Sequence, residues 1–185
     1  MPSRWYPLRI CHSSIKRQSE LNEALQNEPL VERTYVPMNL VDVDDMTYVP
    51  ALVNYLFVRT TLEGLKNLKA EKGKYEHLRY VMNRNLNEDF LPVSEIAYVP
   101  DKQMEDFIRV TELANEQVIQ LQNMAFACKP GQRVRIRKGL FEGVEGVIKS
   151  LKKHICVVVP VTGIMALAIT NVPRKFLEKC EDDSV

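Results

Sequence analysis

The segment Val134–Ile148 constrains the fold of this chain most, because a strand pattern runs directly into closely spaced glycines. Apolar residues alternate with arginines over Arg133–Arg137, which is the period of a half-buried strand with its arginines in solvent. Gly139 and Gly143 can take the positive φ that a tight connection needs. Gly146 suits a bulge or a close approach of two backbones. The segment predicts two strands of a small β-domain joined by a glycine turn.

Charge is segregated along the chain, although the net charge is only +1. Residues 1–19 carry four basic residues and no acid, and residues 20–46 carry seven acids against one arginine. Residues 129–155 carry eight Lys and Arg against two Glu, a net charge of +6. A basic C-terminal module is suited to nucleic acid or to an acidic protein surface, and solvated strand faces explain the same charges equally well.

The length of 185 residues allows one domain or two small ones. No apolar run is long enough to span a bilayer, and the N-terminus lacks the apolar core of a signal peptide. The four cysteines are far apart and form no CxxC pair, which indicates reduced structural residues: Cys11, Cys128, Cys156 and Cys180. We therefore expect a cytoplasmic protein without a membrane segment.

The N-terminal two thirds of the chain alternate strand and helix patterns. Ser13 or Ser14 can cap a helix over 15–27, and Thr60 with Glu63 has the spacing of a capping box. Strands are expected over 5–11, 31–40, 51–60, 77–82 and 96–99, an exposed acidic loop at Asp42–Asp45, a polar turn over 83–89, and a helix from Pro100 that continues towards Leu121.

Everything after the Lys129-Pro130-Gly131 break has strand character, including Val157–Val159 and the alternation through Ile169. The predicted fold class is therefore α+β. An N-terminal α/β sandwich with a mainly antiparallel sheet is followed by a small SH3-like β-barrel. The predicted domains are residues 1–122 and 131–181, with a linker over 123–130.

This order of modules resembles the NusG family of transcription elongation factors, over nearly the whole chain. Trp5–Arg9 is similar to the family's opening strand, and Pro50–Arg59 resembles its Pro-Leu-Phe-Pro-Gly-Tyr-Leu-Phe-Val-Arg strand. Gly131–Ile148 resembles its KOW motif. Val53 and Asn54 replace the family's second proline and its glycine, which fits specialised RfaH-like or capsule-operon antiterminators.

The resemblance implies a protein that binds the clamp helices of the largest subunit of RNA polymerase and suppresses pausing and termination. By position, the polymerase-binding residues would be Tyr6, Leu8, Tyr55 and Phe57. Strand alternation places Tyr55 and Phe57 on one side of their strand. From spacing alone, a position in the core explains these two rings slightly better, and the resemblance reverses that preference.

Two further contacts are implied by the resemblance. His12, Lys16 and Arg17 stand where RfaH-type members read non-template DNA, and a solvated helix end is the alternative. Phe141, Ile164 and Met165 are the apolar residues with which the KOW domain would contact ribosomal protein S10 or Rho. We expect a stable β-domain and a monomer.

The sequence carries no GxSxG, P-loop, HExxH or GxGxxG pattern, and its histidines are scattered. The acids at Asp42–Asp45 lack the glycine and the terminal glutamate of a calcium loop. We therefore expect no enzyme activity, no catalytic residue, no metal and no cofactor. The alternative function is an RNA- or ribosome-binding protein that acts mainly through the KOW domain.

Overall fold

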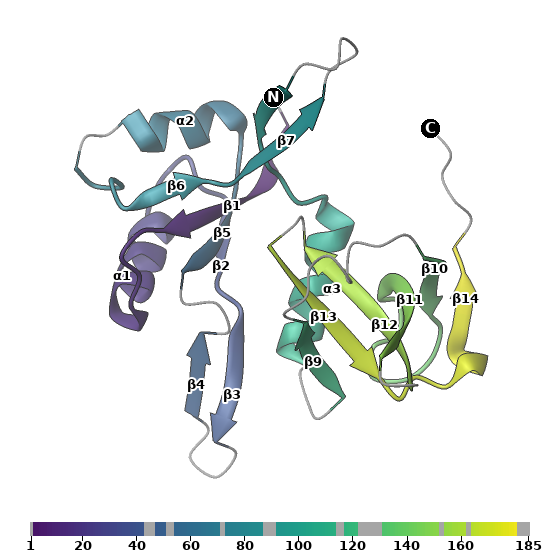
Figure 1. Ribbon diagram of the computed structural model, residues 1–185. Helices are drawn as coiled ribbons and strands as arrows, with labels where there is room; N and C mark the ends of the chain where they lie inside the picture. The colour runs from purple at the N-terminus through teal and green to yellow at the C-terminus, as the bar shows by residue number, and fades with distance from the viewer. Residues whose placement is uncertain are drawn as a thin grey trace. The chain divides into compact units, whose positions relative to one another are not determined.

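The contacts within the chain divide it into two compact units, Met1–Asp101 and Lys102–Val185 (Figure 1). In this computed structural model the described residues are 2–42, 47–50, 54–70, 73–86, 92–113, 117–121, 131–151, 154–161 and 164–180. The predicted linker over 123–130 and the acidic residues Asp44 and Asp45 lie outside them. The predicted domain boundaries at 122 and 131 stay a prediction.

The first unit is built on a four-stranded antiparallel sheet in the order β2-β5-β1-β6. Its strands are β1 (Arg4–Ile10), β2 (Arg33–Tyr35), β5 (Tyr55–Thr60) and β6 (Leu78–Tyr80). Two hairpins accompany this sheet: β3 (Met38–Asp42) with β4 (Thr47–Pro50), and β7 (Met82–Leu86) with β8 (Pro92–Ile96). The polar turn expected over 83–89 is wrong for its first half, because β7 extends to Leu86 in register with β8.

Two helices, α1 (Ile15–Gln26) and α2 (Leu62–Ala70), pack on the same face of this sheet. Leu21 and Leu25 of α1 join Leu65 and Leu68 of α2 in one buried cluster. The sheet contributes the alternate side chains of its two central strands: Tyr6, Leu8 and Ile10 from β1, and Leu56 and Val58 from β5. Burying one face of a sheet under amphipathic helices is the expected architecture for this pattern.

The N-termini of α1 and α2 can be compared with the two helix caps that the sequence predicted. Ser14 is the N-cap of α1, and its side chain accepts a hydrogen bond from the Arg17 amide, as predicted. The predicted capping box at Thr60 is wrong by one residue. The Thr61 hydroxyl accepts from the Gly64 amide at 3.0 Å, whereas the Thr60 hydroxyl donates to the Leu30 carbonyl. Thr60 is buried in the sheet, so its hydroxyl bonds to a segment distant in the sequence and does not cap α2.

The second unit combines α3 (Asp101–Glu112), whose first residue closes the first unit, with a six-stranded antiparallel sheet. The sheet order is β14-β10-β11-β12-β13-β9. The strands are β9 (Val118–Leu121), β10 (Arg133–Ile136), β11 (Glu145–Leu151), β12 (His154–Val161), β13 (Met165–Thr170) and β14 (Leu177–Lys179), with a 3₁₀ turn η1 (Arg174–Phe176) before β14.

These elements confirm the α+β class. Among the described residues the sheet is open, with β14 and β9 at its edges, and it does not close into a barrel. The helix expected to continue to Leu121 is wrong, because α3 ends at Glu112 and Val118–Leu121 pairs with β13. An apolar segment with β-branched residues can form a helix or a strand. Here it forms a strand, because the edge of β13 is available for pairing.

The central strands of this sheet are apolar on both faces. Val157–Val159 is entirely buried, as is Met165–Ile169 of β13. Such continuous burial explains why Val157–Val159 is an unbroken apolar run and why the alternation in β13 is between large and small apolar residues. Gly146 of β11 allows a close approach to β12, since a Cβ there would lie 2.6 Å from the Val158 carbonyl oxygen. The close approach predicted for this glycine is confirmed.

Candidate functional site

The pairing of β1 with β5 decides which of the predicted polymerase-binding residues share a surface. Pro7 lies opposite Phe57, whereas Tyr6 lies opposite Val58 and Leu8 opposite Leu56. Directly opposed residues point to the same side of a sheet. Tyr6 and Leu8 therefore lie on the helix-covered face, and Tyr55 and Phe57 lie on the other face. The predicted set of four does not form one surface.

The burial of these residues separates them further. Tyr6 and Leu8 are core residues, and burial raises the pKa of the Tyr6 phenol. Phe57 is also fully buried, and Tyr55 alone is partly exposed. Within the described chain, Tyr55 is thus the member of the set that can contact a partner without rearrangement.

Charged residues surround the other face of this sheet. Arg59 reaches Glu32 at 3.1 Å and Asp101 at 3.3 Å, so one guanidinium joins three segments of the first unit. The Arg33 guanidinium lies over the Trp5 ring, 5.8 Å from its centroid. Because Arg59 and Trp5 are directly opposed, this face places cations beside aromatic rings.

Another aromatic contact was not found by sequence reasoning. The Arg4 guanidinium lies 4.2 Å from the centroid of Tyr98, whose side chain is 40% exposed. Tyr98 stands beside the short Trp5–Val99 bridge, so its position depends on a non-local pairing. The signal in the sequence was the tyrosine in Ile96–Val99, which a strand pattern alone cannot assign to a face.

The start of α1 brings two of the three predicted nucleic-acid-binding residues into contact. The Arg17 guanidinium donates to the His12 carbonyl, and His12 has a φ of 52°. Lys16 instead points along the helix towards Glu20, 3.8 Å away, and both side chains are well exposed. The first turn of α1 contains no acid. Cations at a helix N-terminus oppose the helix dipole, so the dipole does not explain these two basic residues.

In the second unit the glycine turn has the conformation that the sequence predicted. Gly139 and Gly143 have φ values of 99° and 86°. Between them, Leu140 is 49% exposed whereas Phe141 is 3% exposed. The expectation that Phe141 contacts a partner from an exposed position is therefore corrected: it is buried, and Leu140 is the exposed residue. Periodicity does not extend through a turn, so the sequence could not decide between the two.

The other two predicted KOW contact residues also differ in exposure. Met165 is buried in β13, and Ile164 is half-buried in the turn before it. A cavity of about 290 Å³ lies beside the glycine turn, and its lining includes Leu140, Phe141 and Phe176. Ile164 and Met165 are not among its lining residues, so the structure does not gather the predicted set around this cavity.

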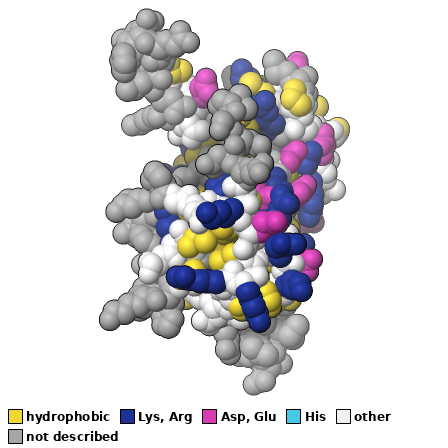
Figure 2. All heavy atoms as spheres, turned by 90° about the vertical axis from the view of Figure 1, so that its right-hand side faces the viewer, with side chains coloured by type: hydrophobic (Ala, Val, Ile, Leu, Met, Phe, Trp, Pro, Cys, Tyr) yellow, Lys and Arg dark blue, Asp and Glu magenta, His cyan; other side chains and the backbone are white. Residues whose placement is uncertain are grey.

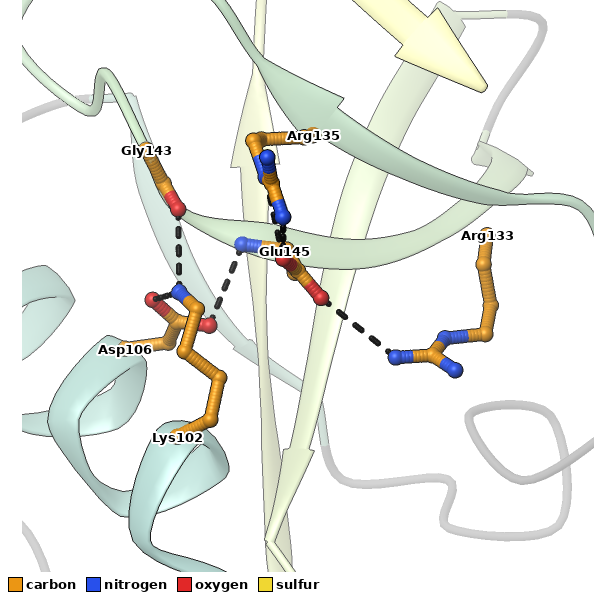
Figure 3. A network of polar contacts seen from close by, with 6 residues as sticks. All are labelled: Lys102, Asp106, Arg133, Arg135, Gly143 and Glu145. Atoms are coloured by element: carbon orange, nitrogen blue, oxygen red, sulfur yellow. Dashed lines mark hydrogen bonds and ion pairs between the residues drawn. The ribbon is translucent and has the colours of Figure 1, made fainter. Parts of the chain in front are cut away.

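A network of polar contacts holds α3 against the glycine turn and the start of β11 (Figure 3). Asp106 accepts a hydrogen bond from the Glu145 amide at 3.2 Å and pairs with Lys102 at 2.5 Å. Lys102 also donates to the Gly143 carbonyl at 3.0 Å. Burial raises the pKa of Asp106, despite the hydrogen bond from Lys102.

The Glu145 side chain continues this network to the basic strand (Figure 3). It pairs with Arg135 at 2.6 Å and with Arg133 at 3.3 Å. Burial alone would raise the pKa of Glu145, but the hydrogen bond from Arg135 and the nearby cations lower it overall. Two arginines of β10 are thus neutralised by one carboxylate, and Arg137 lies 3.6 Å from Glu178.

Cations without such partners gather around the η1 turn. In the part of the chain that the structure describes, no carboxylate lies within 4.0 Å of Lys138, Arg174 or Lys175. Lys138 lines the cavity beside the glycine turn, and Arg174 lines a second cavity of about 370 Å³ with Leu177. Figure 2 shows Lys and Arg side chains around hydrophobic ones on the side where β10 and β14 lie in Figure 1. We call Lys138, Leu140, Arg174, Lys175, Phe176 and Leu177 the basic–apolar surface.

No helix in the described ranges is long and apolar enough to cross a membrane. Among the same residues, His, Cys, Asp and Glu side chains do not gather in a group that would hold a metal ion. Cys11, Cys156 and Cys180 are free thiols, and burial raises the pKa of Cys156.

Comparison with known proteins adds no family to these observations, since neither a family model nor a curated protein matches this chain.

Proposed function

We propose that this chain is a non-enzymatic transcription elongation factor of the NusG type, which binds RNA polymerase and suppresses pausing and termination. The observation that carries the proposal is the pairing of β1 with β5 in a helix-covered antiparallel sheet. This sheet precedes a β-unit whose glycine turn has the conformation expected of a KOW motif. The two parts follow each other in the order that the resemblance implies, and the residues that carry the resemblance lie in those parts.

In the proposed mechanism, the partly exposed end of the β5 face that carries Tyr55 contacts the clamp helices. Tyr55 supplies the accessible ring, and Arg59 supplies charge four residues further along the same face of the strand. Binding the closed state of polymerase more tightly than the paused state shifts the population towards elongation. The mechanism requires differential affinity and no bond chemistry, so no catalytic group is needed.

The remaining contacts are parts of the same proposal. Arg17 and Lys16 at the start of α1 contact phosphates of the non-template strand, which positions the protein without reading sequence. The second unit recruits ribosomal protein S10 or Rho. We propose the basic–apolar surface for that contact, because Phe141 and Met165 are buried. Val53 and Asn54 depart from the family's strand pattern, and these departures favour an operon-specific antiterminator.

The test is co-purification of the tagged chain with core RNA polymerase. Tyr55→Ala is the informative variant, because Phe57 is buried and its truncation would perturb folding. We expect Tyr55→Ala to weaken binding at least about tenfold, as for an aromatic interface anchor. Tyr98→Ala is the matched control, since Tyr98 is an exposed tyrosine beside Arg4 on another part of the unit. Wild-type protein that does not bind polymerase would refute the proposal.

A second candidate function is RNA or ribosome binding, which the basic–apolar surface favours. Its cations have no carboxylate partner in the described chain, and its exposed leucine and half-buried phenylalanine lie among them. Phosphate contacts release counterions, so affinity for RNA should fall steeply with salt. Combined Lys138→Glu, Arg174→Glu and Lys175→Glu should abolish RNA binding and leave polymerase binding intact. Lys66→Glu, an exposed change on α2, is the control.

A further inference from the structure

Two cationic side chains that the proposals above do not use meet at one edge of the sheet of the first unit. The edge strand is β6, which pairs with β1, and α2 precedes it in the chain (Figure 1). The Lys69 ammonium donates to the Leu78 carbonyl at 2.5 Å, and the Arg79 guanidinium donates to the same oxygen at 2.9 Å. One cation from α2 and one from β6 therefore lie side by side.

The fold explains why these two side chains converge. The Cys11 amide donates to the His77 carbonyl at 2.8 Å, which directs that carbonyl towards β1. Bonded and unbonded residues alternate along an antiparallel pair, so the next carbonyl, that of Leu78, points away from β1. Lys69 lies in the last turn of α2, from which its side chain reaches this carbonyl. Burial lowers the pKa of Lys69, and the nearby Arg79 lowers it further.

Arg9 of β1 brings a third cation to this edge. It lies directly opposite Arg79, and such pairs share one side of a sheet with Cβ atoms about 4.5–5.5 Å apart. Both arginines are exposed. Among the residues that the structure describes, no carboxylate lies within 4.0 Å of Lys69, Arg79 or Arg9, and the neighbouring Glu76 pairs with His77 at 3.6 Å. Three positive charges thus gather there without an anion from the described chain.

Satisfying the Leu78 carbonyl does not explain this arrangement. One donor is enough for a carbonyl, and Lys69 supplies it while also donating to the Tyr75 carbonyl at 3.1 Å. A second cation on the same oxygen adds like-charge repulsion, which an anion between the cations would offset. Donors remain for such an anion: the third N–H of Lys69, Nε and Nη2 of Arg79, and the guanidinium of Arg9.

We propose that Lys69, Arg79 and Arg9 bind a phosphate group. Guanidinium groups hold phosphate oxygens through two parallel hydrogen bonds, and an ammonium adds a point charge. A phosphomonoester carries about −1.5 to −2 charges at pH 7, so it matches three cations better than a carboxylate does. A free phosphate or nucleotide and the backbone of a single strand share this chemistry. Phosphate binding by the chain alone does not depend on the polymerase contact proposed above.

The test is a titration of the isotope-labelled full chain, followed by NMR at the backbone amides of Arg9 and Arg79. The probes are inorganic phosphate, adenosine monophosphate and a short single-stranded DNA without a terminal phosphate, each compared with sodium chloride at equal ionic strength. We expect saturable shifts at both amides with at least one probe and not with chloride. Shifts with the oligonucleotide alone would assign the phosphate to a strand. The absence of saturable shifts with every probe, or equal shifts with chloride, overturns the proposal.

Substitutions separate a phosphate site from protection of the sheet edge. Arg79→Gln removes the charge and keeps an amide donor, so we expect the Kd of the bound probe to rise at least about tenfold. The melting temperature without the probe should stay equal or rise, because a like-charge contact is lost. The probe should raise the melting temperature of wild type and not that of the variant.

Lys69→Gln should weaken binding in the same way. Lys66→Gln is the matched control, since it removes an equal charge from an exposed position on the same helix, and it should alter neither affinity nor stability. Affinity that is unchanged in both Arg79→Gln and Lys69→Gln overturns the proposal. If those variants also lose stability, the two cations serve only to protect the edge of β6.

Discussion

Gly146 is the position where the structure makes the sharpest quantitative prediction. A Cβ added there would meet the Val158 carbonyl oxygen at 2.6 Å, the Val157 Cγ1 atom at 2.7 Å and the Val158 carbonyl carbon at 3.1 Å. Two of these atoms are backbone, in a strand paired on both sides with β11 and β13. The strand cannot withdraw without disturbing two ladders of hydrogen bonds. Gly146→Ala therefore forces a steric clash that no rotamer change relieves.

The magnitude follows from two opposed effects. Overpacking of a tightly packed region costs typically about 1–3 kcal/mol. Replacing Gly by Ala reduces the entropy of the unfolded chain, which returns about 0.4–1 kcal/mol. Because the clash is with backbone, we place the overpacking at the upper end and expect a net loss of roughly 2 kcal/mol. For a protein of this length that lowers the melting temperature by about 4–8 °C.

The assay is thermal unfolding of the full chain, with hydrogen–deuterium exchange of the peptides that span β11 and β12. Exchange should accelerate in those peptides and stay unchanged in β1 and β5 of the first unit. Ser150→Ala, an exposed change on the same strand, should stay within about 0.5 kcal/mol of wild type. A Gly146→Ala variant that is as stable as wild type would refute the close approach of β11 to β12.

Three further predictions concern the first unit. Ser14→Ala removes the α1 N-cap and should cost about 1 kcal/mol in urea denaturation. Phe57→Ala should cost about 3–5 kcal/mol, because the ring is fully buried, and a loss below about 1 kcal/mol would show that it is not. Hydrogen bonds from Lys74 and Tyr75 lower the pKa of Glu28 below its ordinary value of 4.5, so this stabilisation exists above that value and is lost as the pH falls through the lowered pKa. Glu28→Gln should therefore flatten the acid side of a plot of melting temperature against pH.

Local patterns predicted the features that depend on neighbours in the chain. The positive φ of Gly139 and Gly143 and the start of α3 were predicted correctly, and the observed α1 cap, Ser14, is one of the two serines predicted. Each of these depends on the chemistry of a few consecutive residues. Where two states were locally acceptable, prediction failed: Val118–Leu121 became a strand because an edge of β13 was available to it.

The candidate site shows the same division. Alternation correctly separated Tyr55 and Phe57 from Leu56 and Val58, since the period of a strand is intrinsic to it. The sequence could not give the register between β1 and β5, and a shift of one residue exchanges every side chain between the two faces. The observed register places Tyr6 and Leu8 in the core, away from the face that Tyr55 shares.

The sequence by itself therefore determined the α+β class, the order of most elements and the glycine turn, because local periodicity and backbone preference fix these. Only the tertiary structure decided that Leu140, and not Phe141, is exposed, and that Arg9 lies opposite Arg79. Both outcomes depend on contacts between segments distant in the chain. Such contacts are selected by the packing of the whole unit and leave no period in the sequence.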